Sequence, residues 1–334
     1  MGNEMRCGMK RNPEAVGREI RQARTIAVCS HINPDGDTLG SAAAMGLALK
    51  SLGKEVTLFC DGKIPDNLSF LPGADTFRRP DGTEGPFDLL LAVDISDQAR
   101  LGRCESLLSR VKRTAQIDHH PTNPLFADVN SVDGDAPATC VLIREQLKEL
   151  GVSLNRDLAI CLYTGMSTDT GNFSFHSTNA ETFEIMAELM RNDLPLSTLS
   201  RILFRERARP QVLLMGRAIK SLRYYAEGRI AAMKLTARDF ADCDALAEHA
   251  DTIVNIGLET VGTDMALLGR DAEEGMVKFS LRAKSPQRID DVAQSLGGGG
   301  HPQASGVTMP GPLDEALARV VAAMMKKLDG NGAA

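Results

Sequence analysis

The sequence contains no tryptophan and only three tyrosines among its 334 residues. Proteins that bind long single-stranded nucleic acid stack successive bases on aromatic side chains, so the scarcity of these residues argues against that class. Basic residues are not in excess either, because the formal net charge is −6. Binding of long duplex nucleic acid needs a basic face, and this class is therefore also disfavoured. A small anionic substrate remains compatible with the composition.

Long hydrophobic runs are also absent. No run approaches the length that spans a membrane, and the first residues, Met1–Arg24, are charged and contain no apolar signal segment. The seven cysteines are scattered and include no Cys-x-x-Cys pair. This spacing is typical of reduced thiols rather than of a disulfide framework or a structural zinc site. We therefore expect a cytoplasmic protein that does not associate with a membrane.

Short apolar runs alternate with amphipathic segments in the first part of the chain. The expected strands are 26–29, 55–59, 87–93 and 114–117, and the expected helices are 14–23, 38–52, 138–150, 154–166 and 181–190. This alternation predicts a doubly wound, mostly parallel α/β sheet. Two strand pairs and a C-terminal helix later in the chain predict a smaller α+β domain. The expected divisions are an N-terminal domain at 1–190, a helical connector at 191–215 and a C-terminal domain at 216–330, with the active site in the cleft between the domains.

The stretch Ser30–Asp37 places one imidazole and two carboxylates, His31, Asp35 and Asp37, after the first predicted strand. Open α/β sheets build their sites at the carboxyl ends of their strands. Imidazole and carboxylate ligands without a thiolate suit Mn²⁺ or Mg²⁺ better than structural zinc. The alternative is purely structural, with Asp37 capping the helix that starts at Thr38 and the other two residues forming a turn.

Three later segments supply matching groups at the ends of predicted elements. Asp94 follows the 87–93 strand, Asp118-His119-His120 follows the next strand, and Asp169 ends a helix in a turn rich in Thr, Gly and Asn. Each segment has a structural alternative as a helix cap, a partly buried polar turn or an Asx-turn. Together with the first stretch they supply enough ligands for two adjacent metal ions that share one carboxylate. A ligand set of this kind is typical of enzymes that use two metal ions to act on phosphate esters.

The order and spacing of these motifs resemble those of the DHH phosphoesterase superfamily. The four motifs are His31-Ile32-Asn33-Pro34-Asp35-Gly36-Asp37, Val93-Asp94, Asp118-His119-His120 and Thr168-Asp169-Thr170-Gly171. The run Gly297–Gly300 with His301 resembles the glycine-histidine motif of the DHH-associated C-terminal domain. A two-domain chain without further modules is most similar to the nanoRNase group of bifunctional oligoribonucleases and pAp phosphatases.

The resemblance implies two divalent cations, with Mn²⁺ expected first and Mg²⁺ or Co²⁺ as alternatives. The implied ligands are His31, Asp35 and Asp94 for one cation, and Asp37, Asp94, His119 and Asp169 for the other. Asp94 then bridges the cations, and a metal-bridging hydroxide attacks phosphorus in line. His120 is expected to donate to a phosphoryl oxygen or to orient the scissile group, and Asp118 is expected to fix an imidazole tautomer. Asn123 is expected to hydrogen-bond the substrate, with a turn-forming role as the alternative.

The C-terminal domain is expected to select the substrate. The residues expected to do so are Ser280, Arg282, Lys284, Gly298, Gly299, Gly300 and His301. Consecutive glycines can turn their backbone N–H groups toward one point and form an anion nest. The alternation along 280–284 places its three polar side chains on one strand face, and the resemblance favours Arg282 as a phosphate clamp.

The implied function is hydrolysis of di- to few-nucleotide RNA to mononucleotides, together with dephosphorylation of pAp. Such an enzyme is a hydrolase of the oligoribonuclease and 3′(2′),5′-bisphosphate nucleotidase type, and its partners are short oligoribonucleotides and pAp. The alternatives are hydrolysis of cyclic di-AMP or its linear product pApA, and nucleotide sensing without turnover. A homodimer is compatible with the sequence. Phe173 and Phe175 lie near Asp169 and are expected to pack in the core.

Overall fold

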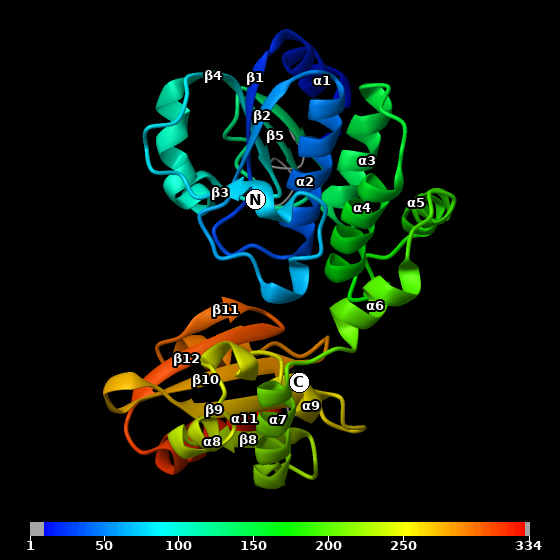
Figure 1. Ribbon diagram of the computed structural model, residues 1–334. Coiled ribbons are helices and arrows are strands. Elements are labelled where there is room, and N and C mark those ends of the chain that lie inside the picture. Colours follow the sequence, from blue (N-terminus) through cyan, green and yellow to red (C-terminus); the bar gives the residue numbers. More distant parts are fainter. Residues whose placement is uncertain (1–9, 331–334) are drawn as a thin grey trace. The chain divides into compact units, whose positions relative to one another are not determined.

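A computed structural model describes residues 10–330, which form two compact units that meet in the sequence between Glu206 and Arg207 (Figure 1). Each unit contains one six-stranded sheet. The segment expected as a connector contains α6 (Leu196–Phe204), which belongs to the first unit, and the start of α7 (Arg209–Ser221), which belongs to the second. No helix in the described part of the chain is long and apolar enough to cross a membrane.

The sheet of the first unit has the strand order β3-β2-β1-β4-β5-β6, and all its neighbouring strands are parallel. The strands are β1 (Thr25–Cys29), β2 (Glu55–Phe59), β3 (Phe77–Arg78), β4 (Phe87–Val93), β5 (Val111–Asp118) and β6 (Val129–Val132). The predicted parallel α/β sheet is therefore confirmed. The chain winds outward from β1 to one edge and then from β4 to the other edge. The carboxyl ends of β1 and β4 thus form a topological switch point, where open α/β sheets bind their ligands.

Six α-helices contribute to the main core of this unit, which lies on one face of the sheet. They are α1 (Pro13–Gln22), α2 (Gly36–Ser51), α3 (Thr139–Glu149), α4 (Arg156–Asp169), α5 (Ala180–Met190) and α6, which buries Leu199. The opposite face is covered by the 3-10 segment η4 (Gln98–Arg110), which buries Leu101, Cys104 and Leu107. Two short 3-10 turns, η2 (Asp66–Leu68) and η3 (Ala74–Thr76), precede β3. Burial of the sheet on both faces explains the near-continuous apolar run of β4.

Helices α2 and α4 approach each other closely because glycines line their contact. A Cβ atom on Gly36 would lie 2.7 Å from Cγ2 of Thr168, and one on Gly165 would lie 2.5 Å from Oδ1 of Asp37. Neither position can accept a side chain without movement of its neighbours, so glycine is required for the close approach of the two backbones. The contact brings Asp37, at the start of α2, next to the last turn of α4, which ends at Asp169.

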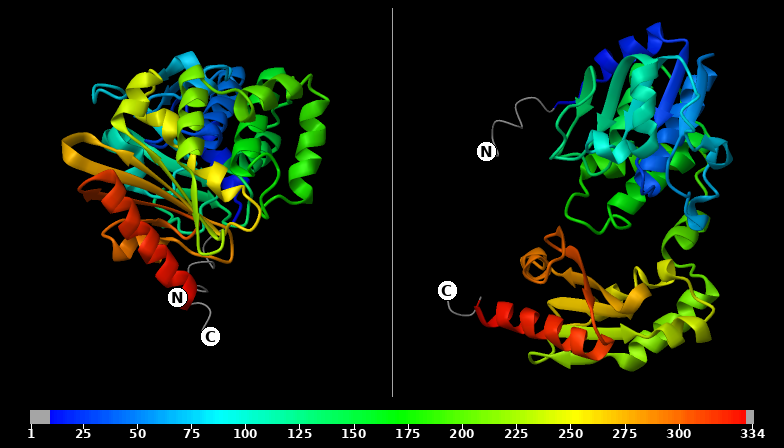
Figure 2. Two further views of the ribbon diagram at one scale, coloured as in Figure 1. Left: turned by 90° about the horizontal axis from the view of Figure 1, so that it is seen from below. Right: turned by 90° about the vertical axis from the view of Figure 1, so that its left-hand side faces the viewer.

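The second unit has the strand order β11-β12-β10-β9-β8-β7, in which only β8 and β9 are parallel. Its strands are β7 (Arg223–Tyr225), β8 (Ile230–Leu235), β9 (Met265–Asp271), β10 (Met276–Ala283), β11 (Gly299–His301) and β12 (Ala304–Pro310). The further helices are α8 (Ala237–Asp242), η5 (Ala247–Ala250), α9 (Val254–Leu258), η6 (Glu273–Gly275), α10 (Asp290–Ser295) and α11 (Leu313–Gly330). Helix α11 lies along one face of the sheet and α7 and α9 pack on the other (Figure 2). This arrangement confirms the predicted smaller α+β domain.

Candidate metal centre

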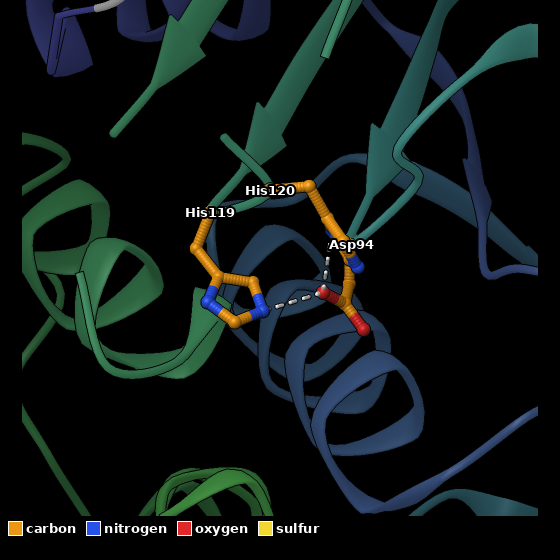
Figure 3. A group of neighbouring side chains, drawn as sticks. All are labelled: Asp94, His119 and His120. Carbon is orange, nitrogen blue, oxygen red and sulfur yellow. Dashed lines mark ion pairs between the residues drawn. The ribbon is translucent and has the colours of Figure 1, made fainter. Parts of the chain in front are cut away.

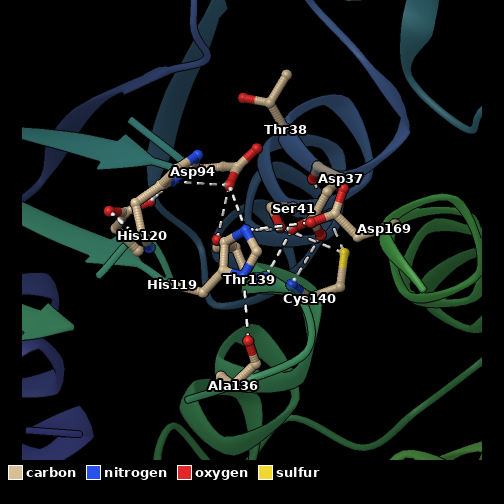
Figure 4. Close-up of polar contacts among 12 residues, drawn as sticks. Asp37, Thr38, Ser41, Asp94, His119, His120, Ala136, Thr139, Cys140 and Asp169 are labelled. Carbon is tan, nitrogen blue, oxygen red and sulfur yellow. Dashed lines mark hydrogen bonds and ion pairs between the residues drawn. The ribbon is translucent and has the colours of Figure 1, made fainter. Parts of the chain in front are cut away.

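The side chains of the four motifs meet at the carboxyl edge of the first sheet (Figure 4). Each comes from the end of an element, because they follow β1, β4 and β5 or lie in the last turn of α4. Their ligand atoms form three overlapping groups, within each of which all atoms lie within 4.8 Å of one another. The groups are His31, Asp35 and Asp94; Asp37, His119 and Asp169; and Asp94, His119 and His120. The structure therefore brings together all six residues predicted as metal ligands.

His31 faces two carboxylates. Its Nε2 atom lies 3.5 Å from Oδ2 of Asp35 and 3.5 Å from Oδ2 of Asp94, which is longer than a strong hydrogen bond. Asp35 also caps α2, because its Oδ1 atom accepts from the N–H groups of Asp37 and Thr38. The cap that sequence reasoning offered to Asp37 thus belongs to Asp35. The second carboxylate oxygen of Asp35 faces His31. The carboxylate of Asp37 is therefore not needed as a helix cap and is available for other contacts.

Asp37 is fully buried, and its carboxylate is held by the first turn of α3. Oδ2 accepts from the N–H of Thr139 over 2.6 Å, and Oδ1 accepts from the N–H of Cys140 over 2.9 Å. A helix N-terminus is a favourable place for such a negative charge. Even so, burial and the nearby carboxylates of Asp94 and Asp169 raise the pKa of Asp37 well above its usual range. The carboxylates here repel one another unless a cation lies between them.

His119 presents Nε2 to the same carboxylates. Nδ1 lies 3.1 Å from the carbonyl oxygen of Ala136, which can only accept, so Nδ1 carries the hydrogen. Nε2 lies 3.1 Å from Oδ2 of Asp169 and 3.6 Å from Oδ1 of Asp94. Burial lowers the pKa of His119, but the hydrogen bond to Asp169 and the charges of Asp37 and Asp94 outweigh burial and raise this pKa to about 11. Without a metal, a proton on Nε2 therefore balances part of the negative charge.

Asp94 lies between the groups and takes part in two of them. Its Oδ1 atom faces the imidazole of His119 (Figure 3). The same atom accepts from the hydroxyl of Thr139 over 2.9 Å, whereas Oδ2 faces His31. Burial raises the pKa of Asp94, although His31 acts in the opposite direction. Its φ of 57° is unusual for a residue other than glycine, and such backbone strain is concentrated at functional sites.

His120 is oriented by a buried carboxylate. Nδ1 donates to Oδ1 of Asp118 over 2.7 Å, while Oδ2 of Asp118 accepts from the N–H of His120 and from the amide of Asn123. Nδ1 also lies 3.8 Å from Oδ1 of Asp94, but its hydrogen bond to Asp118 makes it unsuitable as a metal ligand. The expectation that Asp118 fixes an imidazole is thus confirmed, and His120 is left without a metal-binding role through this atom.

Asn123 does not offer a free side chain to a substrate. It is buried, and its amide nitrogen donates to Asp118 and to the carbonyl of Ile95, while its oxygen accepts from Gln116 and from the N–H of Leu125. Its amide is therefore engaged within the protein, which favours the turn-forming alternative over the expected substrate contact. Asn123 acts on the site only by holding Asp118.

The donor set fits divalent cations of the hard or borderline kind. Among residues 10–330, no lysine or arginine forms an ion pair with the four clustered carboxylates, whose ion-pair partners are imidazoles. The buried Nδ1 atom of His31 also has no hydrogen-bond partner within the described part of the chain. Burying several carboxylates is costly unless cations balance them, and oxygen with imidazole ligands suits Mn²⁺ and Mg²⁺. The residues present therefore fit the cations that the motifs imply.

In the second unit, the residues along β10 lie as predicted. Phe279, Leu281 and Ala283 are buried, so Ser280 and Arg282 occupy the opposite face. Burial lowers the pKa of Arg282, and this guanidinium forms no ion pair with a carboxylate of residues 10–330. Lys284 follows the end of β10 and donates to the carbonyl of Thr260.

The glycine run differs from the predicted nest. Gly299, Gly300 and His301 form the edge strand β11, which pairs with β12, whereas Gly298 lies just before it. Gly300 has a φ of 144°, and a Cβ atom there would lie 2.7 Å from Cα of Ser305. The expectation of N–H groups turned toward one point is therefore wrong, because cross-strand pairing straightens the run. His301 is exposed at the end of this strand.

Sequence reasoning missed the segment that begins α3. Ala136 supplies a carbonyl, Thr139 a hydroxyl and an N–H, and Cys140 an N–H to the three central side chains of the site. One signal was available, since a helix N-terminus predicted after a sheet strand is a ready anion-binding position. Nothing in the sequence alone states that the anion held there is Asp37.

A parallel α/β sheet with clustered carboxylates and imidazoles at its switch point defines a metal-dependent phosphoesterase scaffold. The chain belongs to the DHH family: the family's N-terminal domain matches residues 25–166, and the DHHA1 domain matches residues 230–328. A Thermus thermophilus protein named bifunctional oligoribonuclease and PAP phosphatase NrnA is 32% identical over 311 residues, which cover 92% of this chain and 91% of that protein. A Bacillus subtilis protein of the same name is 28% identical, and the aligned residues cover 87% of this chain and 91% of that protein.

Solved structures agree on the fold. An exopolyphosphatase-related protein from Bacteroides fragilis superposes with a TM-score of 0.87 and 25% identity, covering 94% of this chain and 95% of that one. The Mn²⁺ complex of RecJ from Thermus thermophilus has a TM-score of 0.52 and 16% identity, covering 94% of this chain and 54% of that one. The latter likeness shows a shared fold and no more.

Proposed function

We propose that the protein hydrolyses short oligoribonucleotides to mononucleotides and removes a phosphate from pAp, using two divalent cations of which Mn²⁺ is the preferred one. The family membership and the activities named for the Thermus and Bacillus relatives support this proposal. The observation that carries it is Asp94, whose two oxygens face two different groups of ligands at the switch point of the sheet. A shared carboxylate of this kind is expected where two cations act on one phosphate.

We assign His31, Asp35 and Asp94 to one cation, and Asp37, Asp94, His119 and Asp169 to the other. When bound, such cations lower the pKa of water and stabilise the charge of the reacting phosphate. The protein's own part is to present these ligands already oriented. Thr139 and Cys140 fix Asp37 and Asp94, and the carbonyl of Ala136 keeps Nε2 of His119 available.

His120 is the proposed donor to the phosphate. Asp118 takes the hydrogen on Nδ1, so the ring is held in one orientation with Nε2 as its remaining polar atom. A protonated Nε2 donates a hydrogen bond to a phosphoryl oxygen, where it stabilises negative charge that develops during attack. Loss of Asp118 should therefore harm catalysis through the position of His120 rather than through metal loss.

Arg282 is the proposed phosphate anchor in the second unit. A guanidinium forms two parallel hydrogen bonds with a phosphate, and this one lacks an ion-pair partner among the described residues. Small residues lie opposite on β12, since Gly306 pairs with Ser280 and Ala304 pairs with Arg282. Small neighbours on β12 leave room beside Ser280 and Arg282, which are both partly exposed. An anchor that holds one phosphate favours substrates of few nucleotides.

The test is an activity panel with purified protein and Mn²⁺. We expect mononucleotide release from an RNA dinucleotide, phosphate release from pAp, and little turnover of a long single-stranded RNA. Asp94→Asn should abolish both activities, and Asp75→Asn, at an exposed aspartate on η3, should leave them unchanged. Binding of pAp without turnover would contradict the proposal in favour of a sensor. Faster turnover of cyclic di-AMP than of the linear dinucleotide would contradict it in favour of a cyclic dinucleotide phosphodiesterase.

A further inference from the structure

The loop after Asp169, residues 170–178, has an unusual backbone. Gly171, Asn172 and Phe173 are consecutive and have φ values of 56°, 55° and 63°, and the left-handed region is unfavourable for the latter two. Hydrogen bonds hold this path, because the N–H of Asn172 donates to the carbonyl of Ser167 over 2.7 Å and that of Phe175 donates to the carbonyl of Thr170 over 3.0 Å. A strained path that is held by its surroundings is a feature of functional sites.

The two phenylalanines of this loop have different environments. Phe173 is partly buried against the main core, with its ring 6.3 Å from that of Tyr163 and 5.7 Å from that of Phe183. Phe175 is 55% exposed. The expectation of core packing is therefore right for Phe173 and wrong for Phe175. A single exposed apolar side chain is ordinary by itself, but this one lies on a strained loop that follows a predicted metal ligand, and strain of this kind clusters at functional sites.

The ring of Phe175 lies directly against Gly171. A Cβ atom on Gly171 would lie 2.5 Å from Cζ and 2.8 Å from Cδ1 of Phe175, so the ring covers the glycine backbone directly. Gly171 follows Asp169 by two residues, which limits the separation of their Cα atoms to roughly 7.6 Å. The carboxylate of Asp169 belongs to the metal-binding cluster. An exposed aromatic ring thus covers a backbone position two residues after a member of the metal-binding cluster.

We propose that Phe175 is a stacking surface for a nucleobase of the substrate, and this inference rests on the proposed phosphoesterase function. Every base has an apolar π-face, and stacking on an aromatic side chain contributes to binding without selecting a particular base. Among the described residues, the large aromatic side chains that are exposed are Phe175, Phe183 and Tyr224, and Phe175 is the one that lies within a few residues of a predicted metal ligand. Phe175 therefore favours nucleotides over phosphate esters that lack a base.

The test compares pAp with its abasic counterpart, 1-deoxyribose 3,5-bisphosphate, in steady-state kinetics with Mn²⁺. Phe175→Leu keeps an apolar cover on Gly171 and removes the flat ring. We expect the KM for pAp to rise about 5- to 100-fold, the range for one base–aromatic stack, with kcat little changed. The KM for the abasic compound should not change, and Phe175→Tyr should behave like the wild type.

Phe183→Leu is the matched control, because Phe183 is 56% exposed but lies on α5. A second measurement does not depend on turnover: a pAp analogue with 2-aminopurine should lose fluorescence when it binds Asp94→Asn protein, and less so when Phe175→Leu is added. Wild-type protein that releases no phosphate from pAp would disprove the proposed function. If the wild-type protein is active and Phe175→Leu leaves the KM for pAp unchanged, the stacking role alone is overturned. The same conclusion follows if Phe183→Leu changes this KM as much as Phe175→Leu does.

Discussion

Replacement of Thr139 by valine would remove one buried hydroxyl while keeping the shape of the side chain. The hydroxyl donates to Oδ1 of Asp94 over 2.9 Å, and both residues are buried. A hydrogen bond to a charged group contributes about 1.5–3 kcal/mol, and about 1.4 kcal/mol corresponds to a tenfold change in an equilibrium constant. We therefore expect Thr139→Val to weaken binding of divalent cations roughly 10- to 100-fold, as is typical when an outer partner of a metal ligand is lost.

The assay is a titration of pAp hydrolysis with Mn²⁺, from which the half-saturating metal concentration is read. Thr139→Val should shift this concentration upward, whereas Thr139→Ser keeps the hydroxyl and should resemble the wild type. The N–H of residue 139, which donates to Asp37, is present in both variants. If Thr139→Val titrates like the wild type, or if both variants shift equally, the hydroxyl does not position Asp94 and the reasoning is refuted.

Three further predictions follow from the same geometry. Asp94→Asn should lower kcat/KM by more than about 100-fold for both an RNA dinucleotide and pAp. The circular dichroism spectrum should stay native, because asparagine tolerates the left-handed backbone at this position. Loss of only one of the two activities would contradict a shared centre. In metal-free protein, burial lowers the pKa of His31, but Asp35 and Asp94 outweigh burial and raise this pKa to about 9. Protonated His31 therefore contributes its full stabilisation below about pH 6.5, and this contribution is lost as the pH rises toward 9. The melting temperature in EDTA should fall over this pH range, and His31→Gln should reduce the dependence of the melting temperature on pH. Arg282→Met should raise the KM for pAp roughly tenfold with kcat nearly unchanged, and a fall in kcat at saturating substrate would show that Arg282 does more than anchor.

Elements with strong apolar patterns were predictable from the sequence, and those without them were not. The run Phe87–Val93 predicts β4 because a strand buried on both faces must be apolar throughout. Strands β3 and β6 are short, and the β6 sequence Val-Asn-Ser-Val has too few apolar residues to be recognised. The segment η4 buries residues at intervals of three, which suits a 3-10 helix and is missed when intervals of 3.6 are sought.

The site was predictable to the extent that it depends on side chains at element ends. Motif order and spacing predicted six metal ligands, and the structure brings all six together. The backbone groups of Ala136, Thr139 and Cys140 were not predictable, because their role arises only when the start of α3 packs beside α2. The nest expected from the glycine run was wrong for a related reason, since strand pairing with β12 decides its conformation.

The most direct test of the account is a crystal structure of the protein grown with Mn²⁺, with anomalous differences measured near the manganese absorption edge. We expect two strong peaks on either side of Asp94, one contacting His31 and Asp35 and the other contacting Asp37, His119 and Asp169. A map without peaks in this cluster, or with manganese bound only elsewhere, would contradict it.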